Sequence, residues 1–308
     1  MTRSWQDLLP KPVAFVFSGG SALGAIQIGM LKALVEHNLH PNLVVGTSAG
    51  SLNGAVIADF GLEEGTARLD TVWRNVVRED VFPGGAISQM RHFLSTRNSL
   101  FSNDKLAEFV CGALKSARFE ELSLPFGALA TDLLTNHGAL FQSGMLRPAL
   151  LASASIPGIY PPVDIQGKLY VDGGLTANVP LKSAVQMGAA SLVVLDAGEI
   201  CHRQEAPKNI ASMFVASLNA VMRQRVRVEA PALANHVPIL YLPTPCPVAP
   251  GLTNFSQSVA LMEQAYEMAA AFLKEAPVPA IGNMSGAPHF HDDAPISGTT
   301  HMGMASAD

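Results

Sequence analysis

A serine flanked by glycines is the first feature of the chain whose residue types and spacing could do chemistry. Gly46-Thr47-Ser48-Ala49-Gly50 matches the G-x-S-x-G pattern, with an apolar run before it and helical spacing after it. In that setting the pattern predicts a nucleophile elbow, a sharp strand-to-helix turn that exposes the serine hydroxyl. The following helix would put Ser48 at its N-terminus, where free N–H groups stabilise negative charge. The pattern therefore predicts nucleophilic attack by Ser48, and the alternative is a tight turn without chemistry.

A second glycine turn precedes the first and reads Ser18-Gly19-Gly20-Ser21-Ala22-Leu23-Gly24. The dinucleotide-binding pattern G-x-G-x-x-G fails, because Ser18 stands two residues before Gly20 and Leu23 stands three residues after it. No Gly-Lys-Ser/Thr follows, so the turn is not a P-loop either. Consecutive small residues favour an oxyanion hole, because they let backbone N–H groups point into a cavity. If the two preceding strands are parallel neighbours, both turns meet at one edge of the sheet.

The base that would activate Ser48 is not decided by the residues alone. A histidine after an aspartate would fit the chain order of α/β-hydrolases, and His202 and His236 are available. That fold normally places its nucleophile after more strands than the two that precede Ser48. Asp172 is the other candidate, because a short strand-like run ends in this carboxylate and a glycine turn. An Asp-Gly-Gly sequence is also an ordinary turn, so both possibilities stay open here.

The elements that must position these residues alternate between strands and helices. Residues 13–17 and 43–45 are short apolar runs, each followed by a glycine turn and helical spacing, and 192–195 is another such run. These runs predict buried strands of a parallel sheet, so the expected fold class is α/β. Further predicted elements are helices over 63–77, after 102–104, over 209–229 and from Asn254 with Gln257 as its capping partner, and a β-hairpin over 126–141.

The composition of the 308 residues excludes several classes of protein. With 48% apolar and 15% charged residues the chain is not intrinsically disordered, and its net charge of −5 argues against a nucleic-acid partner. The stretch from Lys11 to Lys32 has no charge between its ends, but its central glycine turn predicts a strand and a helix instead of a membrane span. Reduced thiols in a cytoplasmic protein are expected, because the three cysteines are widely spaced: Cys111, Cys201 and Cys246.

The C-terminal part of the chain differs in composition from the rest. Residues 10–275 are assigned to one domain and residues 276–308, which lack apolar periodicity, to a disordered tail. A metal could be bound there, but a solvated tail is favoured because nothing fixes the geometry of the candidate ligands. These ligands are His289, His291, Asp292 and Asp293.

Three blocks of the sequence together resemble one known family. They are the glycine loop from Ser18 to Gly24, the elbow from Gly46 to Gly50, and Asp172-Gly173-Gly174 with its continuation to Asn178 and Pro180. Ala152-Ser153-Ala154-Ser155-Ile156-Pro157-Gly158 also resembles a segment of that family. On these blocks, which are specific in combination, the chain resembles the bacterial patatin-like phospholipases.

The resemblance implies a three-layer α/β sandwich with a mostly parallel central sheet, and a lipid acyl-ester hydrolase of the phospholipase A or lysophospholipase type. That family uses a Ser–Asp dyad without histidine, which makes Ser48 the nucleophile and Asp172 its base. Gly19, Gly20 and Ser21 match the oxyanion loop. The implied course is an acyl-enzyme on Ser48 that water hydrolyses, without metal or cofactor. The expected partner is a lipid or fatty-acyl ester, with transient contact at a membrane surface.

Aspartate is a weak base, so the site should raise the pKa of Asp172 by burial or hold it close to Ser48. One residue departs from the family pattern, because Leu23 replaces the usual Arg or Lys and predicts altered head-group preference or loop anchoring. Three arginines could meet a phosphate instead, but their spacing favours a solvated helix face: Arg223, Arg225 and Arg227. Two other classes stay open, a Ser-His-Asp esterase and a non-catalytic interaction protein that kept the fold.

Overall fold

The structure is a computed structural model and describes residues 4–82, 84, 89, 95, 99–198, 210–246 and 254–288. Within them an eight-stranded sheet has the order β5-β6-β3-β2-β1-β7-β8, with β4 paired to β3. The parallel strands are β1 (Val13–Phe17), β2 (Leu43–Thr47), β3 (Phe126–Asp132), β7 (Ser191–Leu195) and β8 (Ile239–Tyr241). The antiparallel strands are β4 (Gly138–Phe141), β5 (Val163–Ile165) and β6 (Lys168–Asp172). The predicted parallel sheet and its hairpin, β3 with β4, are confirmed.

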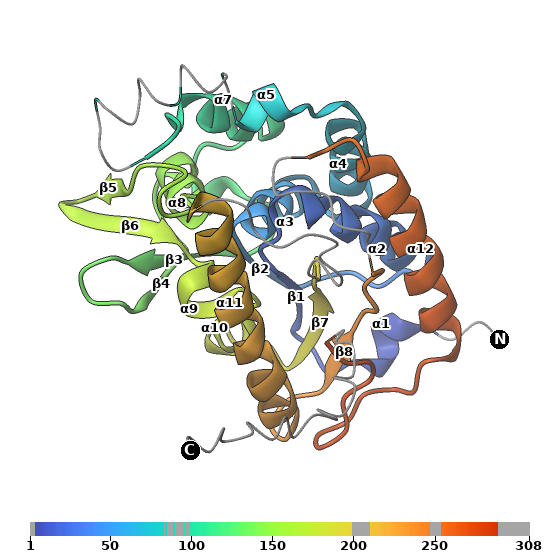
Figure 1. Cartoon of the computed structure of the whole chain (residues 1–308). Helices are drawn as coiled ribbons and strands as arrows, with labels where there is room; N and C mark the ends of the chain where they lie inside the picture. The colour runs from blue at the N-terminus through green and yellow to red at the C-terminus, as the bar shows by residue number, and fades with distance from the viewer. Residues whose placement is uncertain are drawn as a thin grey trace, which may run out of the picture.

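Helices cover both faces of this sheet (Figure 1). One layer holds α2 (Ala25–Glu36), α3 (Ala49–Phe60), α4 (Leu62–Asn75) and α12 (Ser258–Glu275), and the other holds α9 (Gly174–Ala177), α10 (Leu181–Gln186) and α11 (Ile210–Ala234). Strand β1 explains the layering, because Phe15 and Phe17 pack into the first core whereas Ala14 and Val16 pack into the second. The predicted three-layer α/β architecture is thus confirmed.

Shorter helical elements complete the fold. They are α1 (Trp5–Leu8), the 3-10 turn η1 (Ser21–Gly24), α5 (Arg78–Val81), α7 (Asp104–Ala113), the 3-10 turn η2 (Phe119–Glu121) and α8 (Leu146–Ser153). The uncharged stretch 12–31 forms β1, the glycine loop and most of α2, as the sequence predicts. Across the described ranges no helix combines the length and the apolar character that crossing a bilayer requires.

The last helix begins later than the sequence predicts, and the residues before it have another role. Helix α12 starts at Ser258, and the side chain of Gln257 makes no capping hydrogen bond. The Asn254 carboxamide instead accepts a hydrogen bond at 3.0 Å from the backbone N–H two residues on, which stabilises a turn. Phe255 therefore precedes the helix and packs against Trp73, with ring centroids 6.1 Å apart.

Part of the segment predicted to be a loose tail is bound to the sheet. The Ser285 N–H donates to Ile239 O at 3.0 Å, and the Tyr241 N–H donates to Ser285 O at 2.7 Å. Strand β8 is an edge strand, and its otherwise unpaired backbone groups are what this segment satisfies. Residues 277–288 thus differ from the prediction, while the candidate metal ligands from His289 onward lie outside the described residues.

Candidate active site

Ser48 occupies a strained turn between β2 and α3, as predicted for a nucleophile elbow. Its backbone has φ 54° and ψ −129°, a region that residues with a Cβ atom rarely adopt. The flanking glycines allow the tight approach that the turn needs. A Cβ atom at Gly46 would lie 2.4 Å from Gly50 O, and one at Gly50 would lie 2.3 Å from Ser18 O. The elbow therefore packs directly against the start of the glycine loop.

Ser153, the last residue of α8, holds this turn in place. Its hydroxyl accepts a hydrogen bond from the Ser48 N–H at 3.0 Å and donates one to Leu129 O at 2.6 Å. The side chain is fully buried. Sequence reasoning assigned no role to Ser153, although the segment 152–158 that contains it was singled out by the resemblance. Only that motif context could have pointed to it.

Asp172 stands at the end of β6, and the backbone of the segment after α8 fixes its place. The Asp172 N–H donates to Ser155 O at 2.9 Å, and the Gly173 N–H donates to Ser153 O at 3.3 Å. The same short segment therefore anchors both predicted catalytic residues, Ser48 through a side chain and Asp172 through the backbone.

The carboxylate of Asp172 is buried and only partly satisfied. Its Oδ1 accepts the Gly174 N–H at 2.8 Å, whereas its Oδ2 has no hydrogen-bond partner among the described residues. Burial raises the pKa of Asp172 to about 6, and the Ser48 hydroxyl and the Gly174 N–H lower it by smaller amounts. The Ser48 hydroxyl is thus close to the carboxylate, although the geometry falls short of a full hydrogen bond. The raised pKa makes Asp172 a better proton acceptor than an ordinary aspartate.

The glycine loop lies beside Ser48 at the carboxyl edge of β1. A Cβ atom at Gly19 would lie 3.1 Å from the Ser48 Cβ and 2.5 Å from Asn178 Oδ1. The Gly19 N–H donates to Asn178 O at 2.9 Å, and the Asn178 side chain donates back to Gly19 O at 3.3 Å. In this conformation the Gly19 donor is therefore occupied. The Gly20 N–H has no partner within the described part of the chain, and Ser21 and Ser48 line the same cavity.

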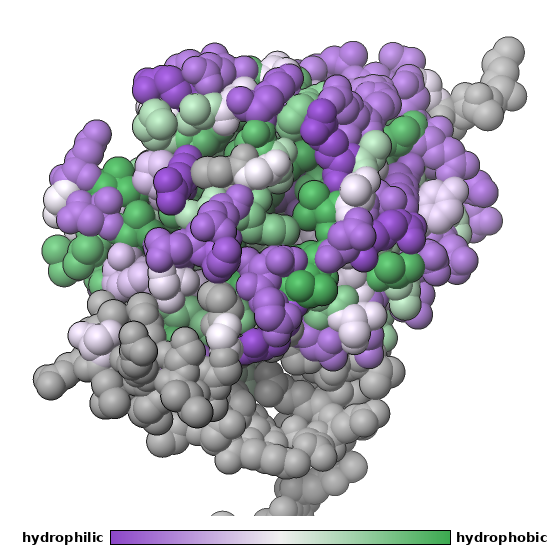
Figure 2. All heavy atoms as spheres, turned by 90° about the horizontal axis from the view of Figure 1, so that it is seen from above, coloured by the Kyte–Doolittle hydropathy of each residue, from purple (hydrophilic) through white to green (hydrophobic). Residues whose placement is uncertain are grey.

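An apolar cavity of about 790 Å³, its open mouth included, begins at Ser48. Helices α3, α4 and α7 and the segment after α5 supply its walls, among them Leu52, Leu69, Trp73 and Phe109. Figure 2 shows apolar side chains in the hollowed part of this face, between hydrophilic ones. The sequence predicts an apolar groove shaped by residues 82–100. Phe82 does line the cavity, and most of the rest of that segment lies outside the described residues.

Comparison with known proteins assigns this site to a family. The family model described as "Patatin-like phospholipase" matches residues 15–185, which contain the elbow, the glycine loop and Asp172. The chain belongs to the patatin-like phospholipase family. The resemblance seen in the sequence is therefore confirmed at the level of the family.

Individual relatives match about two thirds of this patatin-like chain. Patatin-like phospholipase domain-containing protein 7 of Mus musculus is 30% identical over 202 residues, which cover 64% of this chain and 14% of the mouse protein. An uncharacterized NTE family protein of Mycobacterium tuberculosis is 26% identical over 213 residues, which cover 68% of this chain and 56% of that protein. The chain thus spans only part of the length of these relatives.

Solved structures with a related arrangement are more distant from this patatin-like chain. VipD from Legionella pneumophila aligns over 85% of this chain and 66% of its own, with a TM-score of 0.45 and 13% identity. Human GIVD cytosolic phospholipase A2 aligns over 89% of this chain and 60% of its own, with a TM-score of 0.43 and 12% identity.

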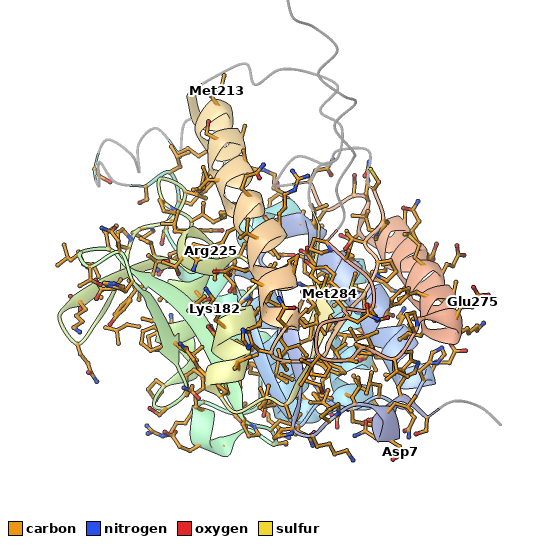
Figure 3. All side chains as sticks on the ribbon, turned by 90° about the horizontal axis from the view of Figure 1, so that it is seen from below. Asp7, Lys182, Met213, Arg225, Glu275 and Met284 are labelled. Carbon is orange, nitrogen blue, oxygen red and sulfur yellow. The ribbon has the colours of Figure 1, made fainter. Side chains whose placement is uncertain are left out.

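The two histidines considered as alternative bases, and the arginines considered as phosphate contacts, are not seen near Ser48 among the described residues. His236 is exposed and precedes β8, so it lies at the opposite edge of the parallel sheet from Ser48. His202 lies outside the described residues. Arg225 of α11 pairs with Glu229 at 2.8 Å, beside Lys182 of α10, which binds the same carboxylate at 3.1 Å (Figure 3).

Leu23, the residue that departs from the family pattern, is buried. Only 7% of it is exposed, and it belongs to the larger hydrophobic core. The position therefore packs into the protein and presents no charge to the site.

Proposed function

We propose that this chain is a serine hydrolase of lipid acyl esters in which Ser48 is the nucleophile and Asp172 the base. One observation carries the proposal. A buried carboxylate, one of whose oxygens has no hydrogen-bond partner among the described residues, lies beside a serine in a strained turn, and that serine lines an apolar cavity. Membership of the patatin-like phospholipase family supports the same reaction class.

The proposed reaction begins with transfer of the Ser48 hydroxyl proton to Asp172 Oδ2. The Ser48 Oγ attacks the ester carbonyl carbon, and the carbonyl oxygen becomes an oxyanion. We assign stabilisation of this oxyanion to the Gly20 N–H, which has no partner in the described part of the chain; the next residue, Ser21, lines the same cavity as Ser48. Collapse of the tetrahedral intermediate breaks the ester C–O bond, and the departing alkoxide takes the proton from Asp172. An acyl group then remains on Ser48.

Hydrolysis of this acyl-enzyme repeats the same steps with water. Asp172 accepts a proton from water, whose oxygen attacks the acyl carbon, and the Ser48 oxygen leaves and regains that proton. The product is a fatty acid. Its hydrocarbon chain would lie against the apolar side chains that line the cavity. A lysophospholipase or phospholipase A type of substrate, reached by transient contact with a membrane surface, belongs to the same proposal.

Hydrolysis of p-nitrophenyl esters tests the proposal against its two alternatives. Purified wild type should release p-nitrophenol, Ser48→Ala should lose this activity, and His202→Ala and His236→Ala should keep it. Loss of activity in either histidine variant would favour a Ser-His-Asp esterase. A folded wild type that hydrolyses neither short nor long esters would favour the non-catalytic interaction protein. An active wild type should then be assayed on lysophospholipid and diacyl phospholipid vesicles.

A further inference from the structure

Three buried polar side chains lie between the glycine loop and the apolar cavity. The Trp73 Nε1–H donates to Asn53 Oδ1 at 2.9 Å. The Asn53 carboxamide donates to Gln27 Oε1 at 2.8 Å and to Gly24 O at 3.1 Å. These side chains come from α2, α3 and α4, and none is more than 7% exposed. They therefore form one continuous network inside the first helical layer.

Gln27 completes the network at the other end of the loop. Its Nε2 donates to Ser18 O at 2.8 Å and to Leu195 O at 3.1 Å, where β1 and β7 end. The two carboxamides and the indole thus use every one of their five N–H groups. Ser18 and Gly24 are the first and last residues of the glycine loop, and the network holds the carbonyl of each. A buried network that is fully satisfied fixes its parts rigidly.

Trp73 also belongs to the cavity. Its ring and the Asn53 side chain both line the space that begins at Ser48. The ring packs against the loop as well, because a Cβ atom at Gly24 would lie 2.8 Å from Trp73 Cζ2. One side chain therefore contacts the glycine loop and the place where an acyl chain would lie.

We infer that Gln27, Asn53 and Trp73 are positioning residues that hold the glycine loop in its catalytic geometry and join it to the wall of the cavity. The inference rests on the proposed function. None of the three reaches the reacting atoms, so their effect passes through the backbone donors of the loop. A loop displaced by a fraction of an ångström loses stabilisation of the oxyanion, which lowers kcat, whereas binding of the ester in the ground state changes little.

A pair of tryptophan substitutions tests this inference with a matched control. The chain has two tryptophans. Trp73→Phe keeps an aromatic wall and removes the N–H that Asn53 accepts. Trp5 lies on α1, at the far end of the molecule (Figure 1), and its buried N–H donates to Leu273 O at 2.9 Å. Trp5→Phe removes this N–H. Both variants leave a buried acceptor unpaired, so both should melt at a lower temperature than the wild type.

The kinetics should separate the two variants. With p-nitrophenyl butyrate and p-nitrophenyl decanoate, Trp73→Phe should lower kcat for both esters by about tenfold to a hundredfold, with the KM for butyrate unchanged. Trp5→Phe should keep the kcat and the KM of the wild type. Equal kcat values for the two variants, each assayed below its melting temperature, would overturn the inference. A wild type that hydrolyses neither ester would instead overturn the proposed function.

Gln27→Met tests the inference from the other end of the network, at a residue that does not line the cavity. It removes the donors to Ser18 O and Leu195 O and should reproduce the fall in kcat without a change in KM. The double variant with Trp73→Phe should lose less activity than the product of the two single losses, because both act on one network. An unchanged kcat in folded Gln27→Met would overturn the inference even if Trp73→Phe does not fold.

Discussion

Asp59 and Asp172 are both buried carboxylates, and the contrast between them separates a structural aspartate from one that we propose to be catalytic. Asp59, near the end of α3, is fully buried and ties the helix to the turn after α7. Its oxygens accept the Lys115 N–H at 2.8 Å, the Ser116 N–H at 3.1 Å and the Ser116 hydroxyl at 2.6 Å. Asp172 accepts one backbone N–H and keeps one oxygen unpartnered among the described residues.

The difference teaches how a fold can prepare a base. Both side-chain oxygens of Asp59 accept hydrogen bonds, so this carboxylate serves to hold the turn after α7. A buried carboxylate with one donor is less stable as an anion, which is why burial raises the pKa of Asp172 to about 6. Oδ2, which has no hydrogen-bond partner among the described residues, is therefore the oxygen of Asp172 that can accept the proton of Ser48.

The largest expected effect that tests this contrast is on turnover. Asp172→Asn should lower kcat for ester hydrolysis by about a hundredfold to ten-thousandfold, because it removes the general base. Asp59→Asn should leave kcat of the folded enzyme unchanged, because the hydrogen bonds of the Asp59 side chain among the described residues all go to the turn after α7. Equal losses of kcat in the two variants, measured with p-nitrophenyl butyrate, would break the comparison.

The pH dependence of wild-type activity should follow the ionisation of Asp172. The base must be ionised to accept a proton, so kcat/KM should be constant above about pH 6 and fall by about tenfold per pH unit below it. Asp59→Asn should show the same profile. A wild-type rate that stays level down to pH 4 would mean that Asp172 is not the group that titrates.

Stability should change in opposite directions in the two variants, and this is the smallest of the three effects. The folded-state pKa of Asp172 lies above its ordinary value of 3.8, so the carboxyl destabilises the fold increasingly as the pH rises from about 4 to about 6. Asp172→Asn should therefore raise the free energy of unfolding at pH 7, by up to about 3 kcal/mol, and have little effect at pH 4.

Asp59→Asn should lower the free energy of unfolding by about 1–3 kcal/mol at pH 7, because it weakens hydrogen bonds to a buried charge. Urea unfolding at pH 4 and pH 7 measures both variants. If Asp172→Asn lowers the free energy of unfolding at pH 7 as much as Asp59→Asn does, both carboxylates stabilise the fold and the contrast between them is wrong.

The sequence predicts the parts of the site that depend on neighbours along the chain. The elbow at Ser48 and the glycine loop each follow a recognisable buried strand, and parallel strands bring their carboxyl ends to one edge. Asp172 is different, because an Asp-Gly-Gly turn is common: the strand-like run before it makes Asp172 a candidate, but only the family resemblance decides in its favour. Its burial and its free oxygen are visible only once β6 is paired with β3.

The contacts that join distant segments could not be predicted from spacing. Ser153 bonds to Ser48 across 105 residues of chain, and Trp73 reaches the loop only through Asn53 and Gln27. Phe255 was placed inside a helix, because a stripe of apolar residues at helical spacing includes it. In the structure a turn at Asn254 keeps Phe255 outside the helix, and its ring packs on Trp73. A polar or aromatic side chain of this kind has no periodicity that distinguishes it from ordinary core packing.

Covalent labelling with a fluorophosphonate, followed by mapping of the modified peptide by mass spectrometry, tests the central proposal most directly. The proposal predicts a single label on Ser48 in the wild type, no label in Ser48→Ala, and labelling in Asp172→Asn that is slower by at least about a hundredfold. Asp59→Asn should be labelled at the wild-type rate. A folded wild type that takes up no label, or a label on Ser48 whose rate does not depend on Asp172, would contradict the Ser–Asp dyad.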